Sequence, residues 1–333
     1  MKGEYIMHKN KLVVVGVGHV GSYVLADAMK IGLFSEIVVI DKEKDIAYGE
    51  ALDQAHATAL TYMTNTTVKA GDYSDCADAD VIIISAGPSI LKNEEGDLPD
   101  RALLAEANSK VIREVMSGIT KYTKDAIVII ITNPLDSMVY IAENEFDYPK
   151  GRVFGTGTML DSARLRQAIA ANYNIDPKSV TGYMMGEHGM TAFPVFSRLS
   201  VQGFGEEDLD KVFEGKVPLN RKAYKDLVVK AAYDVLNGKG WTNAGVAQAA
   251  ITLAKAVLLD ERSVYPVSTT LHGQYGYDGD VALSMPCIVG RNGIEQQLEI
   301  ELDEEETELL HQSARYIQET MEVAKTGKKY LNK

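Results

Sequence analysis

Hydrophobic and polar positions follow two different patterns along the chain. In the first half, short runs rich in Val and Ile alternate with longer stretches that have the amphipathic period of helices; the runs cover residues 11–15, 36–40, 66–70, 80–85 and 126–132. They are nearly continuous in apolar residues, as expected for strands whose two faces are both covered. This pattern predicts an α/β fold, a doubly wound parallel sheet with helices on both faces.

Past about residue 155 the pattern changes. The segments FPVFSRLSVQG, SVYPVSTTLHGQYG and PCIVGRNG resemble antiparallel strands, and helical patterns occur near residues 219–237 and 303–325. The acidic residues 303–306 suit the first turn of the last helix, because they interact favourably with its dipole. We therefore expect a parallel α/β domain over residues 1–154 and a mixed α+β domain over residues 155–333.

Composition excludes several classes of partner. The 333 residues are 46% hydrophobic and 24% charged, which suits two globular domains. A formal net charge of −13 argues against nucleic acid or an anionic membrane, since such a field repels phosphate. The opening MKGEYIMHKNK has no apolar core, and no run approaches the ~18 residues of a membrane span. We expect no targeting signal and no transmembrane segment.

The two cysteines carry information about compartment and metals. Cys76 and Cys287 lie far apart and form no CxxC or Cys/His spacing. We therefore expect neither a disulfide scaffold nor a metal site, and a reduced, cytoplasmic protein.

The first predicted strand ends in a glycine-rich motif, GVGHVG, that leads into a helical pattern. In such a motif the first glycine permits a tight turn, the second admits a pyrophosphate, and the third lets helix and strand pack closely. The helix amides then face the phosphates. An ordinary strand-to-helix turn is the alternative. The candidate cofactor contacts of this loop are Gly16, Gly18, His19, Val20 and Gly21.

Polar residues follow three other predicted strands of this Rossmann-type arrangement. Asp41 ends the second strand, 25 residues beyond Gly16, where a carboxylate can accept hydrogen bonds from ribose hydroxyls. It would also repel a 2′-phosphate, which favours NAD over NADP, although two lysines follow it. Further candidate contacts end the fourth and fifth strands, at the edge where such sheets bind ligands: Ser85, Ala86, Gly87 and Asn133. A simple turn would also explain Asn133-Pro134.

An acid, an arginine and a glycine-flanked histidine occur close together in the second domain: Asp161 and Arg164 in DSARLR, and His188 in GEHG. Residues three apart share one face of a helix. A carboxylate beside an imidazole raises the imidazole pKa, so that it can donate a proton to a carbonyl near neutral pH. A guanidinium can orient a substrate carboxylate through two parallel hydrogen bonds. Singly, these residues could form a surface ion pair and a turn; together they predict reduction of a keto acid.

Arg101 follows a polar segment, residues 88–100, that has neither helical nor strand periodicity. We expect this segment to be a lid that excludes water and brings Arg101 against the carbonyl oxygen as negative charge develops there. The alternative is a solvated arginine at the start of the helix ALLAEANSKVIREV.

Six motifs occur in the order typical of one family: GVGHVG, Asp41, NPLD, DSARLR, GEHG and GKGWT. With them the sequence resembles the L-lactate and malate dehydrogenase superfamily over essentially its whole length. The resemblance implies an NAD-dependent oxidoreductase acting on L-2-hydroxy acids, and a homo-oligomer, a tetramer or a dimer. It assigns His188 as the acid/base, Asp161 as its partner and Arg164 as the carboxylate clamp. It also assigns Arg101 as the mobile polarising arginine.

The resemblance also assigns residues around the substrate. It places Thr242 in the substrate pocket and Val246 against the nicotinamide. From its own position after the fifth strand, Asn133 is expected to contact the nicotinamide ribose and the substrate. Many bacterial lactate dehydrogenases bind fructose 1,6-bisphosphate through an arginine and a histidine. Arg166 and Thr181 stand at those positions here, so we expect little response to that sugar phosphate.

The predicted lid departs from the family pattern. It is longer than in lactate dehydrogenases and has no glutamine to sense the substrate side chain. In place of the arginine of malate dehydrogenases it has only Lys92 among several acids, which disfavours malate without removing it as an alternative. The lid, the apolar residues after GEHG and the segment VLNGKGWTNAGVA look closest to L-2-hydroxyisocaproate dehydrogenase. We therefore expect a pocket for pyruvate or for a bulkier apolar 2-oxo acid such as 2-oxoisocaproate.

Two alternatives come from other functional classes. An NAD-dependent glycoside hydrolase of the same fold would need a metal held by cysteine and histidine, and neither cysteine is placed for that. A non-catalytic binding protein would retain the glycine loop but would have no need of the four catalytic candidates together.

Overall fold

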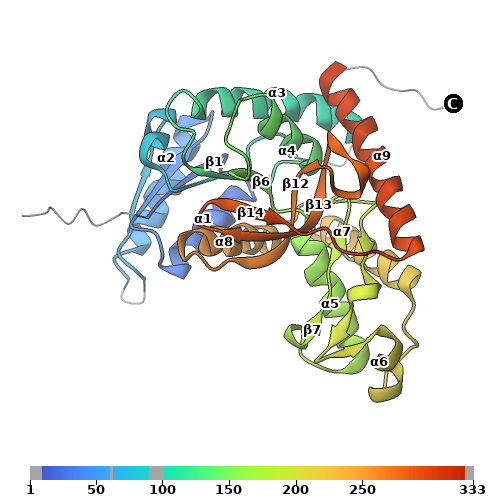
Figure 1. The fold of residues 1–333 in the computed structure, drawn as a ribbon. Helices are drawn as coiled ribbons and strands as arrows, with labels where there is room; N and C mark the ends of the chain where they lie inside the picture. Colours follow the sequence, from blue (N-terminus) through green and yellow to red (C-terminus); the bar gives the residue numbers. More distant parts are fainter. Residues whose placement is uncertain (1–9, 61–62, 90–100, 327–333) are drawn as a thin grey trace, which may run out of the picture.

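The computed structural model describes residues 10–60, 63–89 and 101–326. Within these residues a nine-stranded sheet has the order β14-β13-β12-β6-β5-β4-β1-β2-β3, and helices cover its two faces (Figure 1). Its strands are β1 (Lys11–Val15), β2 (Glu36–Ile40), β3 (Thr67–Ala70), β4 (Val81–Ile84), β5 (Ile127–Ile130), β6 (Val153–Gly155), β12 (Ser263–His272), β13 (Asp278–Gly290) and β14 (Gly293–Gln297).

Six of these strands are parallel, in the order 3-2-1-4-5-6 of a doubly wound dinucleotide-binding sheet. This confirms the predicted Rossmann-type fold. Except in the edge strand β3, their side chains are buried on both faces. Along β1, Leu12 and Val14 belong to one apolar cluster and Val13 and Val15 to another. The alternation follows from the two-residue repeat of a strand. It explains why the sequences of the inner parallel strands are nearly continuously apolar.

The helices that cover the sheet form two layers, which Figure 1 shows above and below it. Helices α3 and α4 pack on one face, and α1 and α8 pack together on the other. The α-helices of the described residues are α1 (Gly21–Ile31), α2 (Lys44–Ala57), α3 (Arg101–Ile119), α4 (Leu135–Asn144), α5 (Met159–Tyr173), α6 (Glu206–Val212), α7 (Arg221–Lys239), α8 (Ala244–Leu258) and α9 (Glu304–Thr326).

The antiparallel strands of the second half extend the same sheet. Strand β12 pairs antiparallel with β6 at Ser268 and Gly155, and β13 and β14 follow it outward. The predicted boundary near residue 155 therefore coincides with β6, a parallel strand that the hydrophobic pattern did not single out. The segment FPVFSRLSVQG, expected to be one strand, is divided into β9 (Phe193–Pro194), a 3₁₀ turn and β10 (Ser200–Val201).

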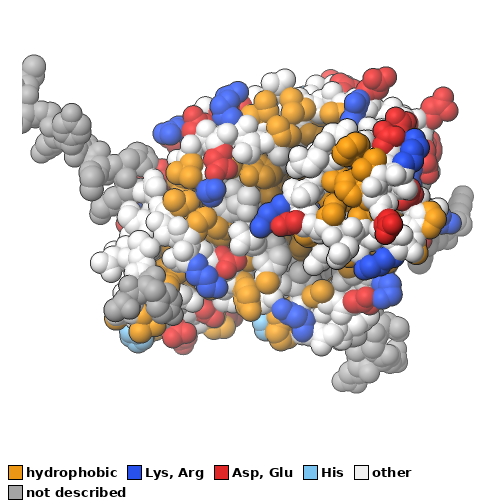
Figure 2. Space-filling model, turned by 90° about the horizontal axis from the view of Figure 1, so that it is seen from below, with side chains coloured by type: hydrophobic (Ala, Val, Ile, Leu, Met, Phe, Trp, Pro, Cys, Tyr) orange, Lys and Arg blue, Asp and Glu red, His pale blue; other side chains and the backbone are white. Residues whose placement is uncertain are grey.

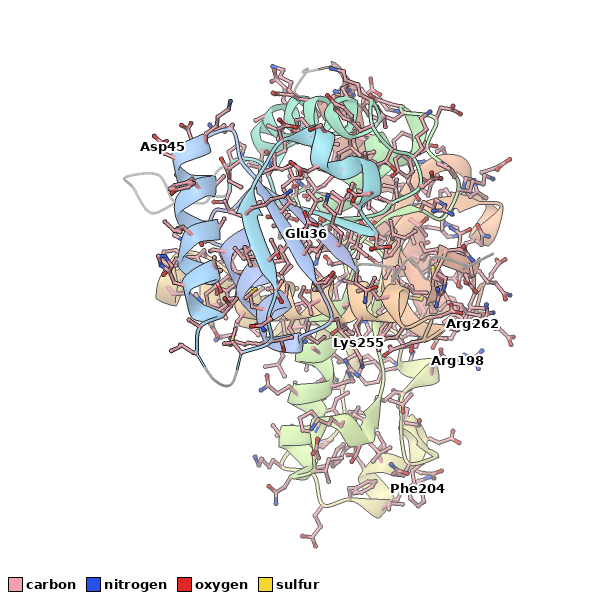
Figure 3. The ribbon with its side chains drawn as sticks, turned by 90° about the vertical axis from the view of Figure 1, so that its left-hand side faces the viewer. Glu36, Asp45, Arg198, Phe204, Lys255 and Arg262 are labelled. Carbon is pink, nitrogen blue, oxygen red and sulfur yellow. The ribbon has the colours of Figure 1, made fainter. Side chains whose placement is uncertain are left out.

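A smaller lobe projects from the large sheet (Figure 1). It contains α5, α6 and a three-stranded sheet of β10 with β7 (Val180–Thr181) and β11 (Phe204–Gly205), and it has an apolar cluster shared with α7. Figure 3 places Phe204 at the far end of this lobe and Glu36 on the parallel part of the large sheet. The lobe is joined to the sheet through the start of α5, and that junction holds three of the predicted catalytic residues, Asp161, Arg164 and His188.

The molecular surface mixes charges of both signs. Figure 2 shows acidic and basic side chains interspersed over one face, with apolar side chains in small groups between them. Among the helices of the described residues, none combines the length and the apolar character needed to cross a bilayer.

Candidate active site

The glycine motif forms a tight turn between β1 and α1. Gly16 has φ +87°, and a Cβ there would lie 2.5 Å from the Cα of Ala86. A Cβ on Gly21 would lie 1.9 Å from the carbonyl oxygen of Gly16. Around Gly18, by contrast, no described atom lies within 4 Å of the Cβ position. Packing therefore requires glycine at Gly16 and Gly21, whereas Gly18 leaves its backbone accessible to a ligand.

Asp41 and Ser85 hold this turn from the neighbouring strands. The carboxylate of Asp41 accepts hydrogen bonds from the Val17 N–H at 2.9 Å and the Glu43 N–H at 3.0 Å. The hydroxyl of Ser85 donates to the Gly16 carbonyl at 2.7 Å. A carboxylate has about four acceptor sites, so Asp41 can still accept from ribose hydroxyls. The glycine cradle and this acid at the carboxyl edge of β2 fit a dinucleotide.

The ends of β4 and β5 are tied together at the same edge. Thr132 donates through its hydroxyl to the Ala86 carbonyl at 2.7 Å, and the Asn108 amide donates to the Asn133 carbonyl at 2.5 Å. Gly87, at φ +131°, packs closely on Asn108. The side chain of Asn133 is exposed at this edge. The structure thus brings the predicted contacts of β4 and β5 to the same side of the sheet as the glycine turn.

The start of α5 is fastened to the strand that leads to His188. Strand β8 (Met184–Met185) lies beside it, with the Thr158 hydroxyl donating to the Met184 carbonyl at 2.6 Å. In return, the Met184 N–H donates to the Ser162 hydroxyl at 2.9 Å. These two bonds flank Asp161 in the sequence, so they set its position relative to His188.

Three consecutive backbone N–H groups hold the GEHG loop to three different elements. Gly186 donates to the Ser284 carbonyl on β13 at 3.1 Å, and Glu187 donates to the Ser313 hydroxyl on α9 at 2.6 Å. His188 donates to the Asp136 carboxylate on α4 at 2.8 Å. The hydroxyl of Ser268, on β12, donates to the other oxygen of the same carboxylate at 2.6 Å. The loop is therefore rigid at the residue that the chemistry needs.

Asp161 joins the two other predicted catalytic side chains. Its Oδ2 lies 2.7 Å from Nδ1 of His188, and its Oδ1 accepts from Nη1 of Arg164 at 3.0 Å. The side chains are 7% exposed for Asp161, 21% for His188 and 13% for Arg164. Limited exposure strengthens these charged contacts, because less water screens them.

The surroundings shift the pKa values of this group. Burial by itself would lower the pKa of His188, but the charge and hydrogen bond of Asp161 outweigh it and raise that pKa above 6.5. Burial would raise the pKa of Asp161, but the charges of His188 and Arg164 lower it below 3.8. Burial raises the pKa of Asp136 to about 6. The site is thus arranged to keep a protonated imidazole beside an ionised carboxylate.

The fourth predicted catalytic residue, Arg101, is the first residue of α3. Its side chain lies outside the part of the chain that the structure describes. The same holds for residues 90–100 of the predicted lid, which include Lys92. A pocket beside His188 is lined by the start of α4 and by α9; its walls include Pro134, Asp136, Glu187 and Tyr316.

The start of α8 approaches both the glycine turn and α5. Thr242 and Val246 are partly buried there, and a Cβ on Gly245 would lie 2.5 Å from Cδ1 of Leu160, the neighbour of Asp161. On the other side, the rings of His19 and Trp241 stack with centroids 3.9 Å apart. The segment therefore lies between the cofactor loop and the catalytic group.

Two residues of this region had no predicted role. Asp136 belongs to the NPLD motif and Trp241 to the GKGWT motif, so both stood in segments already singled out. Their partners, Ser268 and His19, lie too far away in the sequence for spacing to indicate the contacts. In the described part of the chain, no group of three or more His, Cys, Asp or Glu side chains is arranged to hold a metal ion.

Comparisons with known proteins agree with this geometry. Residues 10–155 match the family model of the lactate/malate dehydrogenase NAD binding domain, and residues 158–327 match that of the lactate/malate dehydrogenase alpha/beta C-terminal domain. The chain is 46% identical over 320 residues to L-lactate dehydrogenase 2 of Clostridium acetobutylicum, covering 96% of this chain and 99% of that protein. It is 43% identical over 317 residues to the L-lactate dehydrogenase of Selenomonas ruminantium, covering 95% and 98%.

Solved structures give the same result. A lactate dehydrogenase from a Medee basin deep-sea metagenome library superimposes with a TM-score of 0.87 at 30% identity, covering 96% of this chain and all of that one. The minor L-lactate dehydrogenase of Enterococcus mundtii, in a ligands-bound form, also gives 0.87, at 31% identity, covering 95% and 98%.

Proposed function

The chain belongs to the lactate/malate dehydrogenase family, and from this premise we propose that it is an NAD-dependent L-lactate dehydrogenase that interconverts a 2-oxo acid and an L-2-hydroxy acid. The membership confirms the family resemblance of the motifs. It also supports a dehydrogenase over the glycoside hydrolase and the non-catalytic binding protein. The observation that carries the proposal is Asp161, whose two oxygens bind His188 and Arg164.

His188 is the proton donor in this proposal. Its Nδ1 faces Asp161, so Nε2 is the ring atom that can give a proton to the carbonyl oxygen of the 2-oxo acid. Asp161 holds the ring in one orientation and stabilises its charged form. In the reverse direction the neutral imidazole takes the hydroxyl proton. The raised pKa of His188 suits the direction of 2-oxo acid reduction near neutral pH.

Arg164 binds the carboxylate of the substrate. A guanidinium carries five N–H donors, and the ion pair with Asp161 accounts for one of them. The remaining fork can hold a carboxylate through two parallel bonds and fix the keto carbon relative to His188. Arg101, at the start of α3, is proposed to polarise the carbonyl when the lid closes.

NAD is the cofactor of this family, and NADH, when bound, supplies the electron pair that reduces the keto carbon. The glycine turn, Asp41 and Asn133 would hold it along the carboxyl edge of the parallel strands. Val246, at the start of α8, would contact its nicotinamide. We also propose that the chain divides into an NAD-binding domain, residues 1–154, and a catalytic domain, residues 155–333.

We propose that the substrate is a small apolar 2-oxo monocarboxylic acid, pyruvate or a bulkier acid such as 2-oxoisocaproate. The apolar residues after GEHG and the acidic lid sequence favour a monocarboxylic acid over a substrate with a second carboxylate. Steady-state kinetics with NADH and pyruvate, 2-oxoisocaproate or oxaloacetate test it. We expect the two monocarboxylic acids to be reduced with the higher kcat/KM. A preference for oxaloacetate would replace the proposal by malate dehydrogenase, and no NADH oxidation with any of them would overturn it.

We further propose a homo-oligomer, a tetramer rather than a dimer, that works in the cytoplasm and responds little to fructose 1,6-bisphosphate. Helix α2 presents large apolar side chains to the surface: Ile46 is 50% exposed, Tyr48 62% and Leu52 39%. Both cysteines are buried and unpaired, as suits a reducing compartment. Light scattering coupled to gel filtration gives the subunit number, and a monomer in solution would contradict the oligomer.

A further inference from the structure

An aromatic contact joins the glycine turn to the segment before α8. The imidazole of His19 and the indole of Trp241 are parallel to within 4°, with centroids 3.9 Å apart. His19 lies between the second and third glycines of the motif. Trp241 follows Gly240, which ends α7 with φ +89°, and it is the single tryptophan of the chain. We call this stacked pair the ring clasp.

The ring clasp is a surface contact between two turns. His19 is exposed, and Trp241 is 36% exposed. A second contact joins α1 to the end of α7: Lys239 lies over the ring of Tyr23, 5.9 Å from its centroid. Lys239 also donates a hydrogen bond to Asn243 Oδ1. Because neither ring of the clasp belongs to an apolar core cluster, either can be replaced without opening a cavity in the interior.

Each ring of the clasp stands next to a residue of one ligand site. His19 follows Gly18, whose Cβ position is open, and Trp241 precedes Thr242 at the proposed substrate pocket. We propose that the ring clasp is a positioning device that holds Thr242 in register with the cofactor loop, so that Trp241 and His19 set the affinity for the 2-oxo acid. This inference rests on the proposed function and deepens it.

The energetics of stacking set the size of the expected effect. A stacked pair of this kind is worth about a 3- to 10-fold change in an equilibrium constant beyond the area that it buries. Loss of the clasp lets Thr242 take other positions, which the substrate must then restrict on binding. We therefore expect Trp241→Ala and His19→Ala each to raise KM for the preferred 2-oxo acid about 3- to 10-fold. At saturating NADH the kcat of Trp241→Ala should change less than about twofold, because His188 and Arg164 are untouched. This expectation does not extend to the kcat of His19→Ala, because His19 is also a candidate cofactor contact.

A double-mutant cycle tests whether the two rings act together. KM and kcat are measured for the wild type, His19→Ala, Trp241→Ala and the double variant, with Trp241→Phe as a conservative replacement and Tyr122→Ala as a control. Tyr122 is a 50% exposed aromatic residue just after α3. If the clasp is the cause, the double variant has the same KM as each single variant, and Trp241→Phe restores most of the affinity.

Fluorescence gives an independent measurement, because Trp241 alone contributes tryptophan emission. We expect His19→Ala to raise this emission, since a stacked imidazole quenches indole. The ring clasp would be overturned by additive effects of the two substitutions on KM, or by a Trp241→Ala enzyme whose KM matches that of Tyr122→Ala. Wild-type turnover would still uphold the proposed function in either case. Absence of wild-type turnover would overturn the function. In that case the tryptophan emission of His19→Ala tests whether the two rings stack. Emission equal to that of the wild type would refute the ring clasp.

Discussion

The imidazole of His188 and the carboxylate of Asp161 meet at 2.7 Å, through Nδ1 and Oδ2, at a site where the acid is almost fully buried. This contact fixes which ring nitrogen faces the substrate and raises the pKa of the histidine. The second oxygen of Asp161 binds Arg164, so one carboxylate orients both the proton donor and the carboxylate clamp.

The rate of 2-oxo acid reduction should depend on pH through His188. Reduction needs the protonated ring, so kcat/KM should be level at low pH and fall as pH rises through a pKa above 6.5. Oxidation of the hydroxy acid needs the neutral ring and should rise through the same pKa. Rate profiles in both directions check this. Asp161→Asn should move both curves to lower pH, because the charge that raises the pKa is removed; curves that do not move would contradict the role of Asp161.

The same two groups affect stability with opposite signs. His188 has a raised pKa in the folded state, so its contribution is full below 6.5 and is lost as pH rises through the folded pKa. Asp161 has a lowered pKa, so its contribution is full above 3.8 and is lost as pH falls through the folded value. The pair therefore stabilises the protein most between those limits.

Arg164→Lys should weaken substrate binding while leaving the cofactor site intact. Lysine keeps the charge but cannot form two parallel bonds to a carboxylate. We expect kcat/KM for the 2-oxo acid to fall about 10- to 100-fold, the range of one charged hydrogen bond. The Kd of NADH, measured by its fluorescence, should stay within about twofold. Equal losses in both quantities would show that Arg164 acts through the fold.

Asp136→Asn should preserve the anchor of the His188 backbone. The carboxylate accepts from the His188 N–H with one oxygen and from the Ser268 hydroxyl with the other. In the variant the amide oxygen can still accept from His188, and the amide NH2 can donate to the Ser268 oxygen once that hydroxyl turns. Burial already favours the uncharged acid, so the fold should tolerate the change. We expect kcat to stay within about threefold of the wild type.

Ser268→Ala added to Asp136→Asn should lower kcat further, because it leaves the buried amide NH2 without an acceptor. Steady-state kinetics of the two single variants and the double variant decide it. A double variant as fast as Asp136→Asn would contradict this role of Ser268.

Much of the fold and of the catalytic group follows from local patterns. The continuous Val and Ile runs identify parallel strands, and the GVGHVG and DSARLR motifs carry their chemistry in adjacent residues. The sheet to which β12–β14 belong could not be predicted, because periodicity shows a strand but not its partner. The hydrogen-bond partners that anchor the GEHG loop could not be predicted from the sequence either. Ser284 and Ser313 are ordinary residue types distant in sequence, and their role exists only in the folded chain.

Two glycines of the cofactor turn should respond differently to alanine. Gly21→Ala would place a methyl group 1.9 Å from the Gly16 carbonyl, so we expect both a lower melting temperature and weaker NADH binding. Gly18→Ala meets no described atom within 4 Å, so its melting temperature should match the wild type while NADH affinity falls. Calorimetry and NADH titration separate the two effects. Unchanged NADH affinity in Gly18→Ala would contradict the proposed path of the cofactor.

The most direct test of the account is the rate of NADH oxidation with pyruvate or 2-oxoisocaproate by His188→Asn, measured beside its affinity for NADH. If His188 gives the proton, kcat/KM falls by about 10²- to 10⁴-fold, and the Kd of NADH stays within about twofold of the wild type. A His188→Asn enzyme that binds NADH normally and keeps more than about a tenth of the wild-type kcat/KM would contradict the account, since general acid catalysis contributes far more than that.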